Sequence, residues 1–315
     1  PDVAIQAVNR LRSEGAQVIL GAAASGVTQA FIQTLYDSKI VQCSASATSP
    51  SFSTQENAAY FFRTVPPDEA QAPVIADEVA SDGHTRVAIV ARADDYGVAL
   101  ARLVAENLDA LGLESTTIQY DPEAATFDAV VAEVRNYRPD AIVNIGFFFD
   151  GTGIIRGLLE AGFPANIQYG SDGLFLPSLA RDIDPNNPTI LDGMKVTGAS
   201  GGEAFNERLT QVTQGNLIYG GQAYDCVVLL MLAAQAAGST DGDAMIAALA
   251  EITTWKECSD LLAAGENINY DGVSGPLDLD EVGDPTFGRY AIAQFQNGEL
   301  VNIKAVDIDL TELRD

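Results

Sequence analysis

The sequence predicts an α/β fold built on parallel sheets, and three observations support this prediction. Short apolar runs recur along the chain, and each leads through small or polar residues into a segment whose apolar side chains have helical spacing. The 315 residues are enough for two ordinary domains. Apolar residues make up 47% of the chain, which is enough for a core and argues against disorder.

The first informative unit covers residues 18–36. An apolar run from Val18 to Leu20 ends in small residues, and Ser25 and an amphipathic segment follow. This pattern predicts a buried strand, a tight turn and a helix that begins near Ser25. The free N–H groups at a helix start favour an anion, and Ser25 adds a hydroxyl. The alternative is that Ser25 only caps its helix.

A second strand, predicted over residues 40–44, leads into a loop rich in serine and threonine. Consecutive strands of a parallel sheet end at the same edge, which is where ligands collect in such sheets. Ser25 can meet a carboxylate, while the Thr48 hydroxyl and the carbonyls near Ser46 can meet an ammonium group. The pair of loops therefore points to a zwitterion, that is, an amino acid.

The charge of the chain excludes several classes of partner. Lys and Arg total 17 against 44 Asp and Glu, which gives a net charge of −27. This balance argues against nucleic-acid binding and disfavours anionic membrane surfaces. The acidic residues are spread along the chain and are interpreted as a solvated surface. No run approaches the ~18 apolar residues of a membrane helix, so direct membrane insertion is not expected.

Catalytic and metal-binding motifs are missing from the sequence. The single histidine, His84, follows Gly83 and is expected to face solvent. The acidic loop from Asp278 to Asp284 lacks the spacing of a calcium loop and is interpreted as a turn. The turn signal Asn297-Gly298 predicts a hairpin near the end of the chain. We therefore expect no enzyme activity, no cofactor and no metal.

Three cysteines cannot pair completely within one chain. Cys43 lies on a predicted buried strand and is expected to be a small core residue. Cys226 and Cys258 remain as a candidate disulfide pair, which an exported location would permit.

Several short motifs occur in a fixed order along the chain: Gly21-Ala-Ala-Ala-Ser25, Ser44-Ala-Ser-Ala-Thr48, Phe62-Arg63-Thr64, Asp95-Tyr96-Gly97 and Gly170-Ser-Asp172-Gly173. With these motifs the whole chain resembles the type I periplasmic binding proteins. Within them it is most similar to the branched-chain amino-acid (Leu/Ile/Val) receptor group of ABC transporters.

The resemblance implies two doubly wound parallel-sheet lobes joined by three hinge crossings. It assigns residues 1–65 and 197–285 to lobe 1, and residues 66–196 and 286–315 to lobe 2. The chain opens in the middle of an α/β alternation. The resemblance implies that the first strand, helix and second strand of lobe 1 would precede Pro1.

The resemblance also adds residues to the site. Tyr96, at the end of a predicted strand, would cover the ligand, although ordinary packing is the alternative. Asp172 would meet the ammonium group, although Asp-Gly is also a common turn. The complete predicted ligand site is Ala24, Ser25, Ser46, Thr48, Tyr96, Phe147, Phe148, Asp172 and Tyr219. Three consecutive phenylalanines, 147–149, cannot all face the core, so one or two would form an apolar wall.

The implied function is that of an extracytoplasmic receptor of an ABC importer. It would bind an amino acid, apolar or branched-chain, in the cleft between the lobes and close around it, and it would act as a monomer on a membrane permease. The protein would be exported to the periplasm or another extracytoplasmic location, with its signal peptide removed and a lipid anchor on the full-length protein as one option. The open alternatives are a ligand-sensing domain of a receptor or regulator, and a receptor for aromatic carboxylates or amides.

Overall fold

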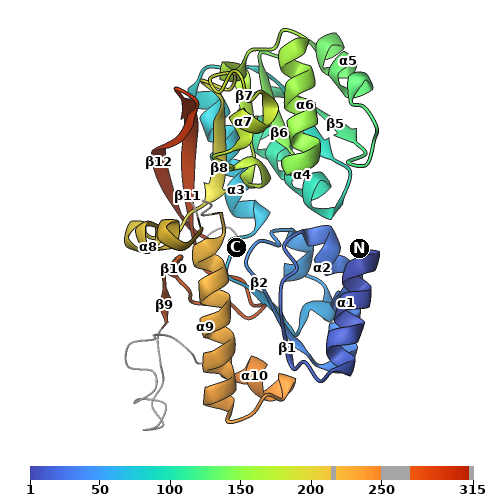
Figure 1. The fold of residues 1–315 in the computed structure, drawn as a ribbon, viewed down its shortest axis with the longest axis vertical. Coiled ribbons are helices and arrows are strands. Elements are labelled where there is room, and N and C mark those ends of the chain that lie inside the picture. Colours follow the sequence, from blue (N-terminus) through green and yellow to red (C-terminus); the bar gives the residue numbers. More distant parts are fainter. Residues whose placement is uncertain (214–217, 250–269, 312–315) are drawn as a thin grey trace. The chain divides into compact units, whose positions relative to one another are not determined.

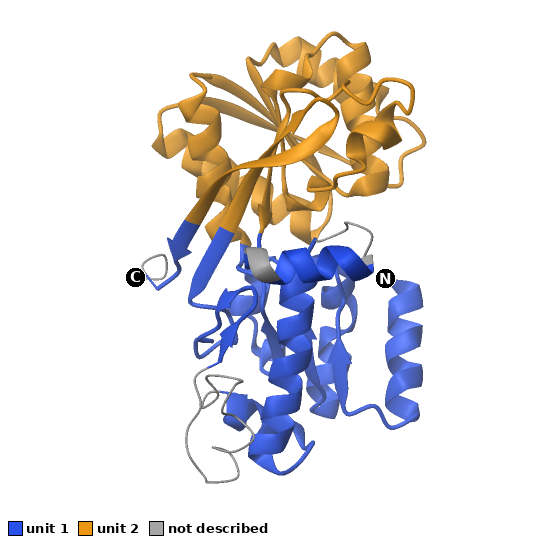
Figure 2. Cartoon of the chain, turned by 60° about the vertical axis from the view of Figure 1, so that its left-hand side comes forward, with its two compact units in different colours: residues 1–67, 200–289, 307–315 blue, residues 68–199, 290–306 orange. Residues whose placement is uncertain are grey.

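The computed structural model describes residues 1–213, 218–249 and 270–311 (Figure 1). The chain divides into two compact units (Figure 2). Unit 1 consists of Pro1–Pro67, Ser200–Arg289 and Asp307–Asp315, and unit 2 consists of Asp68–Ala199 and Tyr290–Val306. Each unit combines helices with a mainly or wholly parallel sheet, so the predicted α/β class is confirmed.

Unit 1 contains a three-stranded parallel sheet in the order β1-β2-β3. Its strands are β1 (Val18–Leu20), β2 (Val41–Ser44) and β3 (Phe61–Arg63). Its helices are α1 (Asp2–Ser13), α2 (Ser25–Ser38), α8 (Glu203–Thr213), α9 (Gly220–Ala237) and α10 (Gly242–Leu249), with short 3-10 turns at Pro50–Ser53 and Glu56–Ala58. The expectation that further elements precede Pro1 stays a prediction.

A disulfide joins the sheet of unit 1 to its longest helix. Cys43 of β2 and Cys226 of α9 are bonded, with their Cα atoms 5.7 Å apart. The expected pairing of Cys226 with Cys258 is therefore wrong, and Cys258 lies outside the described residues. The physical reason is packing: α9 covers β2, and both cysteines lie in the apolar cluster between them, within disulfide range.

The small antiparallel pair β9 (Asp271–Gly272) and β10 (Gly275–Pro276) is anchored to α9 by a buried carboxylate. Asp225 is fully buried and accepts hydrogen bonds from the Tyr270 hydroxyl at 2.6 Å and from the backbone of Val273 at 3.0 Å and Ser274 at 2.8 Å. These bonds satisfy the carboxylate and fix the β9–β10 hairpin.

Unit 2 is built on a seven-stranded sheet in the order β12-β11-β8-β7-β6-β4-β5. Its parallel strands are β4 (Arg86–Arg92), β5 (Glu114–Tyr120), β6 (Ala141–Ile145), β7 (Gln168–Gly170) and β8 (Lys195–Ala199). The sheet is completed by β11 (Phe287–Gln296), antiparallel to β8, and β12 (Glu299–Asp309). The helices of unit 2 are α3 (Asp68–Ser81), α4 (Asp95–Ala110), α5 (Asp128–Tyr137), α6 (Phe148–Glu160) and α7 (Leu179–Ile183), with short 3-10 turns at Ala165–Ile167 and Asp172–Leu174.

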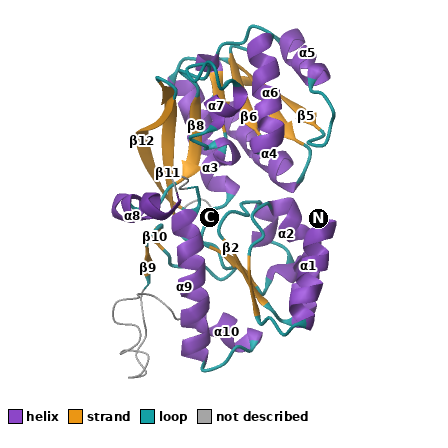
Figure 3. Cartoon of the chain, viewed as in Figure 1, coloured by secondary structure: helices purple, strands orange, loops and turns teal. Residues whose placement is uncertain are grey.

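Helices cover both faces of this sheet (Figure 3). On β4, Val87, Ile89 and Ala91 pack in one apolar cluster with α3 and α4. The alternate residues Ala88 and Val90 pack in another cluster with α5 and α6. Because successive side chains of a strand point to opposite faces, an unbroken apolar run is what a strand buried on both sides requires.

The strand order of unit 2 reverses at β4. The chain adds β5 on one side of β4 and then places β6, β7 and β8 in succession on the other side. Ligands of such sheets bind outside the carboxyl ends of the strands at this switch point. The predicted residues Tyr96, Phe147 and Asp172 follow β4, β6 and β7, and therefore belong to that edge.

The hairpin at the end of the chain turns at Asn297-Gly298, as predicted. Both residues have positive φ, 54° and 80°, which suits a tight hairpin turn. The units differ from the expected lobes here, because the last strand runs past the sheet of unit 2. Asp307 pairs with Arg289, and the N–H of Leu310 bonds to Thr286, so these residues group with unit 1.

The boundary expected after residue 196 also differs. All of β8 lies in the sheet of unit 2, so the chain leaves this unit after Ala199. The chain therefore changes unit at four places, after Pro67, Ala199, Arg289 and Val306, where three crossings were expected.

In the described ranges, no single helix is long and apolar enough to cross a membrane. The helices α9 and α10, which are bent by 108° at the break between them, are together long and apolar enough for a membrane span, by length and composition alone.

Candidate functional site

The first candidate edge lies in unit 1, where β1 and β2 end. The strands pair in parallel with Leu20 opposite Cys43, so their carboxyl ends meet at one edge. At this edge α2 begins at Ser25, after Ala24 in extended conformation. Ser25 is 1% exposed, and its Oγ accepts a hydrogen bond from the backbone N–H of Ser49 at 3.2 Å. The structure therefore brings Ala24 and Ser25 together with the loop that follows β2.

Side chains from β2 and from the bend after it form hydrogen bonds to the loop that precedes α2. Three donors bond to three successive carbonyl oxygens: Gln42 Nε2 to Gly21 at 2.6 Å, Ser44 Oγ to Ala22 at 2.6 Å and Ser46 Oγ to Ala23 at 3.0 Å. Gln42 and Ser44 alternate along β2 and so lie on one face of the strand, and Ser46 follows in the bend after it. The Ser46 hydroxyl is thus engaged by the loop, and its backbone carbonyl remains as the group predicted to meet an ammonium.

The start of α2 offers backbone donors. The first hydrogen bonds back along the chain come from the N–H groups of Val27 and Thr28, which both bond to the carbonyl of Ala24. The N–H groups of Ser25 and Gly26 precede these bonds and belong to the free amides of a helix start. The first turn carries no acidic side chain. The edge can therefore accept a carboxylate without competition from a neighbouring anion.

Two threonine hydroxyls of unit 1 are deeply buried. The side chains of Thr28 and Thr48 are 0% and 2% exposed, and their Oγ1 atoms have no hydrogen-bond partner among the described residues. A buried hydroxyl in this state costs about 1–3 kcal/mol. Thr48 belongs to the predicted site, so a ligand that reaches its hydroxyl would recover this free energy.

A buried arginine holds the loop that carries Thr48. The Arg63 guanidinium is 0% exposed, and its Nη1 donates to the carbonyls of Ala47 at 3.0 Å and Ser49 at 2.9 Å, on either side of Thr48. Its Nε and Nη2 bond to the two carboxylate oxygens of Asp284 at 2.5 and 2.9 Å. The acidic loop that ends at Asp284 therefore serves as an anchor, which agrees with its interpretation as a turn.

The second candidate edge lies in unit 2 and joins three predicted residues. The Tyr96 hydroxyl donates to Asp172 Oδ1 at 2.5 Å, and it lies 2.8 Å from Ser171 Oγ. The rings of Tyr96 and Phe147 are stacked, with centroids 5.1 Å apart and planes inclined by 6°. Tyr96 and Asp172 are 2% and 3% exposed. This group combines a carboxylate with two aromatic rings at the switch point of the sheet.

The surroundings of Tyr96 keep its hydroxyl protonated. Burial raises the pKa of Tyr96 well above its ordinary value, and the carboxylates of Asp172 and Asp68 raise it further. Tyr96 therefore acts as a hydrogen-bond donor to Asp172 over the whole physiological pH range.

Arg92, the last residue of β4, was not predicted as part of this group. Its guanidinium carbon lies 4.0 Å from the centroid of the Phe147 ring. Its Nε donates to Asp94 at 2.6 Å and its Nη1 to Asp150 at 2.9 Å. Both carboxylates neutralise Arg92, which therefore adds no free positive charge to the edge. An arginine at the end of a strand is usually interpreted as solvent-facing, so the sequence analysis did not include Arg92 in the site.

Asp150, in the first turn of α6, connects Arg92 to its neighbours. Besides Arg92, its carboxylate accepts from the Tyr120 hydroxyl at 2.6 Å and from the backbone N–H of Phe147 at 3.2 Å. The acidic residue three places after Phe147 is the signal that could have identified this cap in the sequence.

The structure describes the local positions of the two remaining predicted residues. Phe148 begins α6 and makes an edge-to-face contact with Phe149, which is 87% exposed, so Phe147 is the phenylalanine that joins the Tyr96 group. Tyr219 is partly buried in unit 1, where it precedes α9 with a φ of 54°. The roles of Phe148 and Tyr219 stay predictions.

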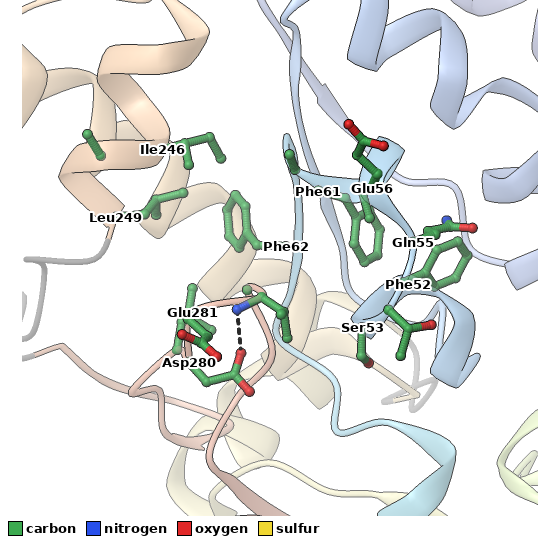
Figure 4. A pocket seen from close by; sticks show the side chains of 17 residues that line it. Phe52, Ser53, Gln55, Glu56, Phe61, Phe62, Ile246, Leu249, Asp280 and Glu281 are labelled. Atoms are coloured by element: carbon green, nitrogen blue, oxygen red, sulfur yellow. Dashed lines mark hydrogen bonds between the residues drawn. The ribbon is translucent and has the colours of Figure 1, made fainter. Parts of the chain in front are cut away.

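A pocket of about 670 Å³ opens in unit 1 away from the predicted residues (Figure 4). Its walls come from the segment 52–62, from α10 and from the loop 279–283. Phe52 and Phe61 pack on each other at one side, while Phe62, Ile246 and Leu249 form another (Figure 4). None of the predicted ligand residues lines this pocket.

His84 is less exposed than expected. Its side chain is 16% exposed and packs against the ring of Tyr169, with centroids 5.8 Å apart, so the predicted solvent-facing position is wrong. Its Nδ1 lies 3.9 Å from Asp140. The loop after Gly83 turns the imidazole onto this ring. Within the described part of the chain, no group of three or more His, Cys, Asp or Glu side chains is placed to hold a metal ion.

Comparison with known sequences identifies relatives along most of the chain. The family described as periplasmic binding protein matches residues 1–299. The chemotactic signal transduction system substrate-binding protein BasB of Halobacterium salinarum is 28% identical over 299 residues, which cover 89% of this chain and 70% of that protein. The Leu/Ile/Val-binding protein homolog 1 of Brucella melitensis is 24% identical over 314 residues, which cover 95% of this chain and 77% of that protein.

Solved structures share the fold. The leucine-binding protein LivK of Thermotoga maritima superposes with a TM-score of 0.82 at 20% identity, over 96% of this chain and 83% of that one. A solute-binding protein of R. palustris, solved with benzoate, has a TM-score of 0.78 at 17% identity, over 97% of this chain and 82% of that one. The members of this group are solute-binding proteins rather than enzymes. The chain therefore belongs to the periplasmic binding protein family and has the type I fold of its leucine-binding members.

Proposed function

We propose that this protein is an extracytoplasmic receptor for an apolar amino acid and that it delivers this ligand to the permease of an ABC importer. The observation that carries the proposal is the contrast between the two strand edges. The edge of unit 1 presents hydroxyls and backbone N–H groups, and the edge of unit 2 presents a buried carboxylate with aromatic rings. An amino acid carries one charged group suited to each.

The proposal assigns the ligand's carboxylate to Ser25 and the amides at the start of α2. It assigns the ammonium group to Asp172, to the Thr48 hydroxyl and to the backbone carbonyl of Ser46. Phe147 and Tyr96 would border the ligand's apolar part, with Phe148 and Tyr219 as further apolar contacts. That one ligand contacts both units is an expectation taken from the family resemblance.

The carboxylate of Asp172 favours an amino acid over an aromatic acid. The relative solved with benzoate shows that this fold also serves ligands without an ammonium group. In this chain, however, the cation next to the Phe147 ring is already paired with Asp94 and Asp150. A carboxylate ligand placed next to Asp172 would be repelled by that carboxylate, which raises the free energy of binding.

A second candidate function is ligand sensing, and one comparison favours it. The similarity to BasB, a substrate-binding protein of a chemotactic signal transduction system, extends over most of the chain. Sensing would use the same ligand site but a membrane transducer in place of a permease. Co-purification of the ligand-loaded protein with its membrane partner separates the two: a permease supports transport and a transducer supports sensing.

The ligand proposal is tested by a thermal-shift panel of amino acids, aromatic acids and short amides. A ligand present at a hundred times its dissociation constant should stabilise the protein by about 2.7 kcal/mol, a clearly measurable rise in the melting temperature. A rise with leucine, isoleucine or valine supports the proposal. A rise with aromatic acids alone would contradict it and would favour the aromatic-carboxylate alternative.

A further inference from the structure

A series of side-chain contacts that begins at Arg92 supports the candidate edge of unit 2. The guanidinium carbon lies 4.0 Å from the Phe147 ring centroid, and that ring stacks on Tyr96 at 5.1 Å. Tyr96 in turn donates to Asp172 at 2.5 Å. Each of these contacts is made within unit 2.

The planar guanidinium is fixed in orientation before it meets the ring. Two carboxylates hold it, Asp94 through Nε and Asp150 through Nη1, and Arg92 is 12% exposed. Asp150 also accepts from the backbone N–H of Phe147 at 3.2 Å. Arg92 and Phe147 therefore share one carboxylate as well as their direct contact, and a change in one must move the other.

Two glycines show how closely this series is packed. A Cβ at Gly173, directly after Asp172, would lie 2.7 Å from Cδ1 of Phe147 and 2.4 Å from the carbonyl oxygen of Gly146. A Cβ at Gly97, directly after Tyr96, would lie 2.1 Å from the backbone carbonyl oxygen of Arg92 and 2.5 Å from Cγ of its side chain. The Asp172 turn thus rests on the Phe147 ring, and the start of α4 rests on the Arg92 side chain.

We propose that Arg92 is a positioning residue that sets the place of the Tyr96 hydroxyl and the Asp172 carboxylate through the Phe147 ring. This inference deepens the proposed function, because the ligand group that Asp172 would meet is the ammonium of an amino acid. Lysine at position 92 keeps the positive charge but lacks the planar fork that both carboxylates and the ring require. Arg92→Lys therefore tests orientation rather than charge.

The opposite end of the same strand supplies a matched control. Arg86 begins β4, and its guanidinium carbon also lies 4.0 Å from an aromatic ring, that of Tyr137. It also pairs with a carboxylate, that of Glu114. Arg86→Lys removes the same kind of contacts at the amino end of the strand, away from the ligand edge.

The first measurement needs no ligand. In protein labelled with ¹³C at Cζ of tyrosine, the Tyr96 signal is assigned by its loss in Tyr96→Phe. We expect Arg92→Lys to shift this signal and Arg86→Lys to leave it in place. An unchanged Tyr96 signal in Arg92→Lys, or an equal shift in both variants, would overturn the inference. If Arg92→Lys does not fold, Asp150→Asn loosens the same guanidinium and is measured in its place.

The second measurement compares the affinity for leucine with that for 4-methylpentanoate, which lacks the ammonium group. We expect Arg92→Lys to reduce the preference for leucine roughly tenfold, about 1.4 kcal/mol, and Arg86→Lys to keep it. In an Asp172→Asn background, Arg92→Lys should cause no further loss of preference. An unchanged preference in Arg92→Lys would contradict the inference. If the wild type binds neither compound, the proposed amino-acid function fails, and the tyrosine signal still decides the role of Arg92.

Discussion

The two candidate edges follow the same rule of parallel sheets but use different chemistry. In unit 1 the edge consists of serine and threonine hydroxyls and backbone amides, and the ion pair beneath it, Arg63 with Asp284, is internally neutral. In unit 2 the edge consists of stacked rings and the Asp172 carboxylate, and Arg92, which lies against the Phe147 ring, is shared between two carboxylates.

This difference shows how one fold can prepare two complementary surfaces for a zwitterion. Neutral donors and the dipole of a helix start suit an anion, because they provide hydrogen bonds without a fixed counter-charge. A buried carboxylate beside aromatic rings suits an ammonium group on an apolar ligand. Four predictions, taken from the largest expected effect to the smallest, test whether the two edges are built and used as differently as their structures indicate.

Loss of Arg63 should have the largest effect. Arg63→Met leaves the Asp284 carboxylate buried and releases the carbonyls on both sides of Thr48, so we expect the free energy of unfolding to fall by about 3–5 kcal/mol. Urea unfolding followed by circular dichroism measures this loss. As a control, Arg102→Met removes an exposed pair with Glu106 and should change stability by no more than about 0.5 kcal/mol. Equal effects of the two changes would show that the Arg63 pair does not support unit 1.

Loss of the Cys43–Cys226 disulfide should come next. Replacement of both cysteines by alanine should lower the free energy of unfolding by about 2–5 kcal/mol, because the bond closes a long loop between β2 and α9. Hydrogen exchange locates the effect: amides of β2 should lose protection, while those of β4 in unit 2 should keep it. A double variant as stable as the wild type would contradict a structural role for this bond.

The two edges should then differ in ligand affinity. Asp172→Asn removes a charge-assisted contact, which should weaken leucine binding by about 1.5–3 kcal/mol, or roughly tenfold to a hundredfold. Ser25→Ala removes a neutral hydroxyl and should weaken it by about 1 kcal/mol, or roughly fivefold. Isothermal titration of both variants gives the two values. A larger loss for Ser25→Ala than for Asp172→Asn would reverse the proposed division of roles.

The smallest effect concerns alkaline pH and unit 2. Burial and the Asp150 carboxylate raise the pKa of Tyr120 well above its ordinary value. The unfolded chain therefore loses this proton near pH 10 while the folded protein keeps it. Stability is fully present below pH ~10 and falls above it, by at most about 1.4 kcal/mol per pH unit for this group. Tyr120→Phe should make the decline between pH ~10 and ~11.5 less steep. Identical slopes for variant and wild type would show that Tyr120 does not contribute.

Local patterns predicted the elements that position the site. The small residues before Ser25 located the start of α2, and the apolar run at residues 40–44 located β2. Each of these features depends on neighbouring residues in the chain, and the sequence shows it directly. The family resemblance added Tyr96, Phe147 and Asp172, which the structure brings into one group.

Features that depend on packing between distant segments could not be predicted. The spacing of the cysteines does not reveal that α9 covers β2, so the pairing of Cys43 was missed. Arg63 and Arg92 looked like charged residues at the ends of strands, and only the folded chain shows which carboxylates enclose them. The prediction for His84 was wrong for the same reason, because the ring that packs against it, Tyr169, lies on β7, far from residue 84 in the sequence.

The most direct measurement is the affinity of the wild-type protein for three compounds of one shape: leucine, 4-methylpentanoate and 3-methylbutylamine. If unit 1 binds the carboxylate and unit 2 binds the ammonium group, loss of either charged group should weaken binding by roughly tenfold or more, because each charged contact contributes about 1.5–3 kcal/mol. Binding of 4-methylpentanoate as tight as that of leucine would show that Asp172 does not meet an ammonium group, and would contradict the proposed pairing of the two edges with a zwitterion.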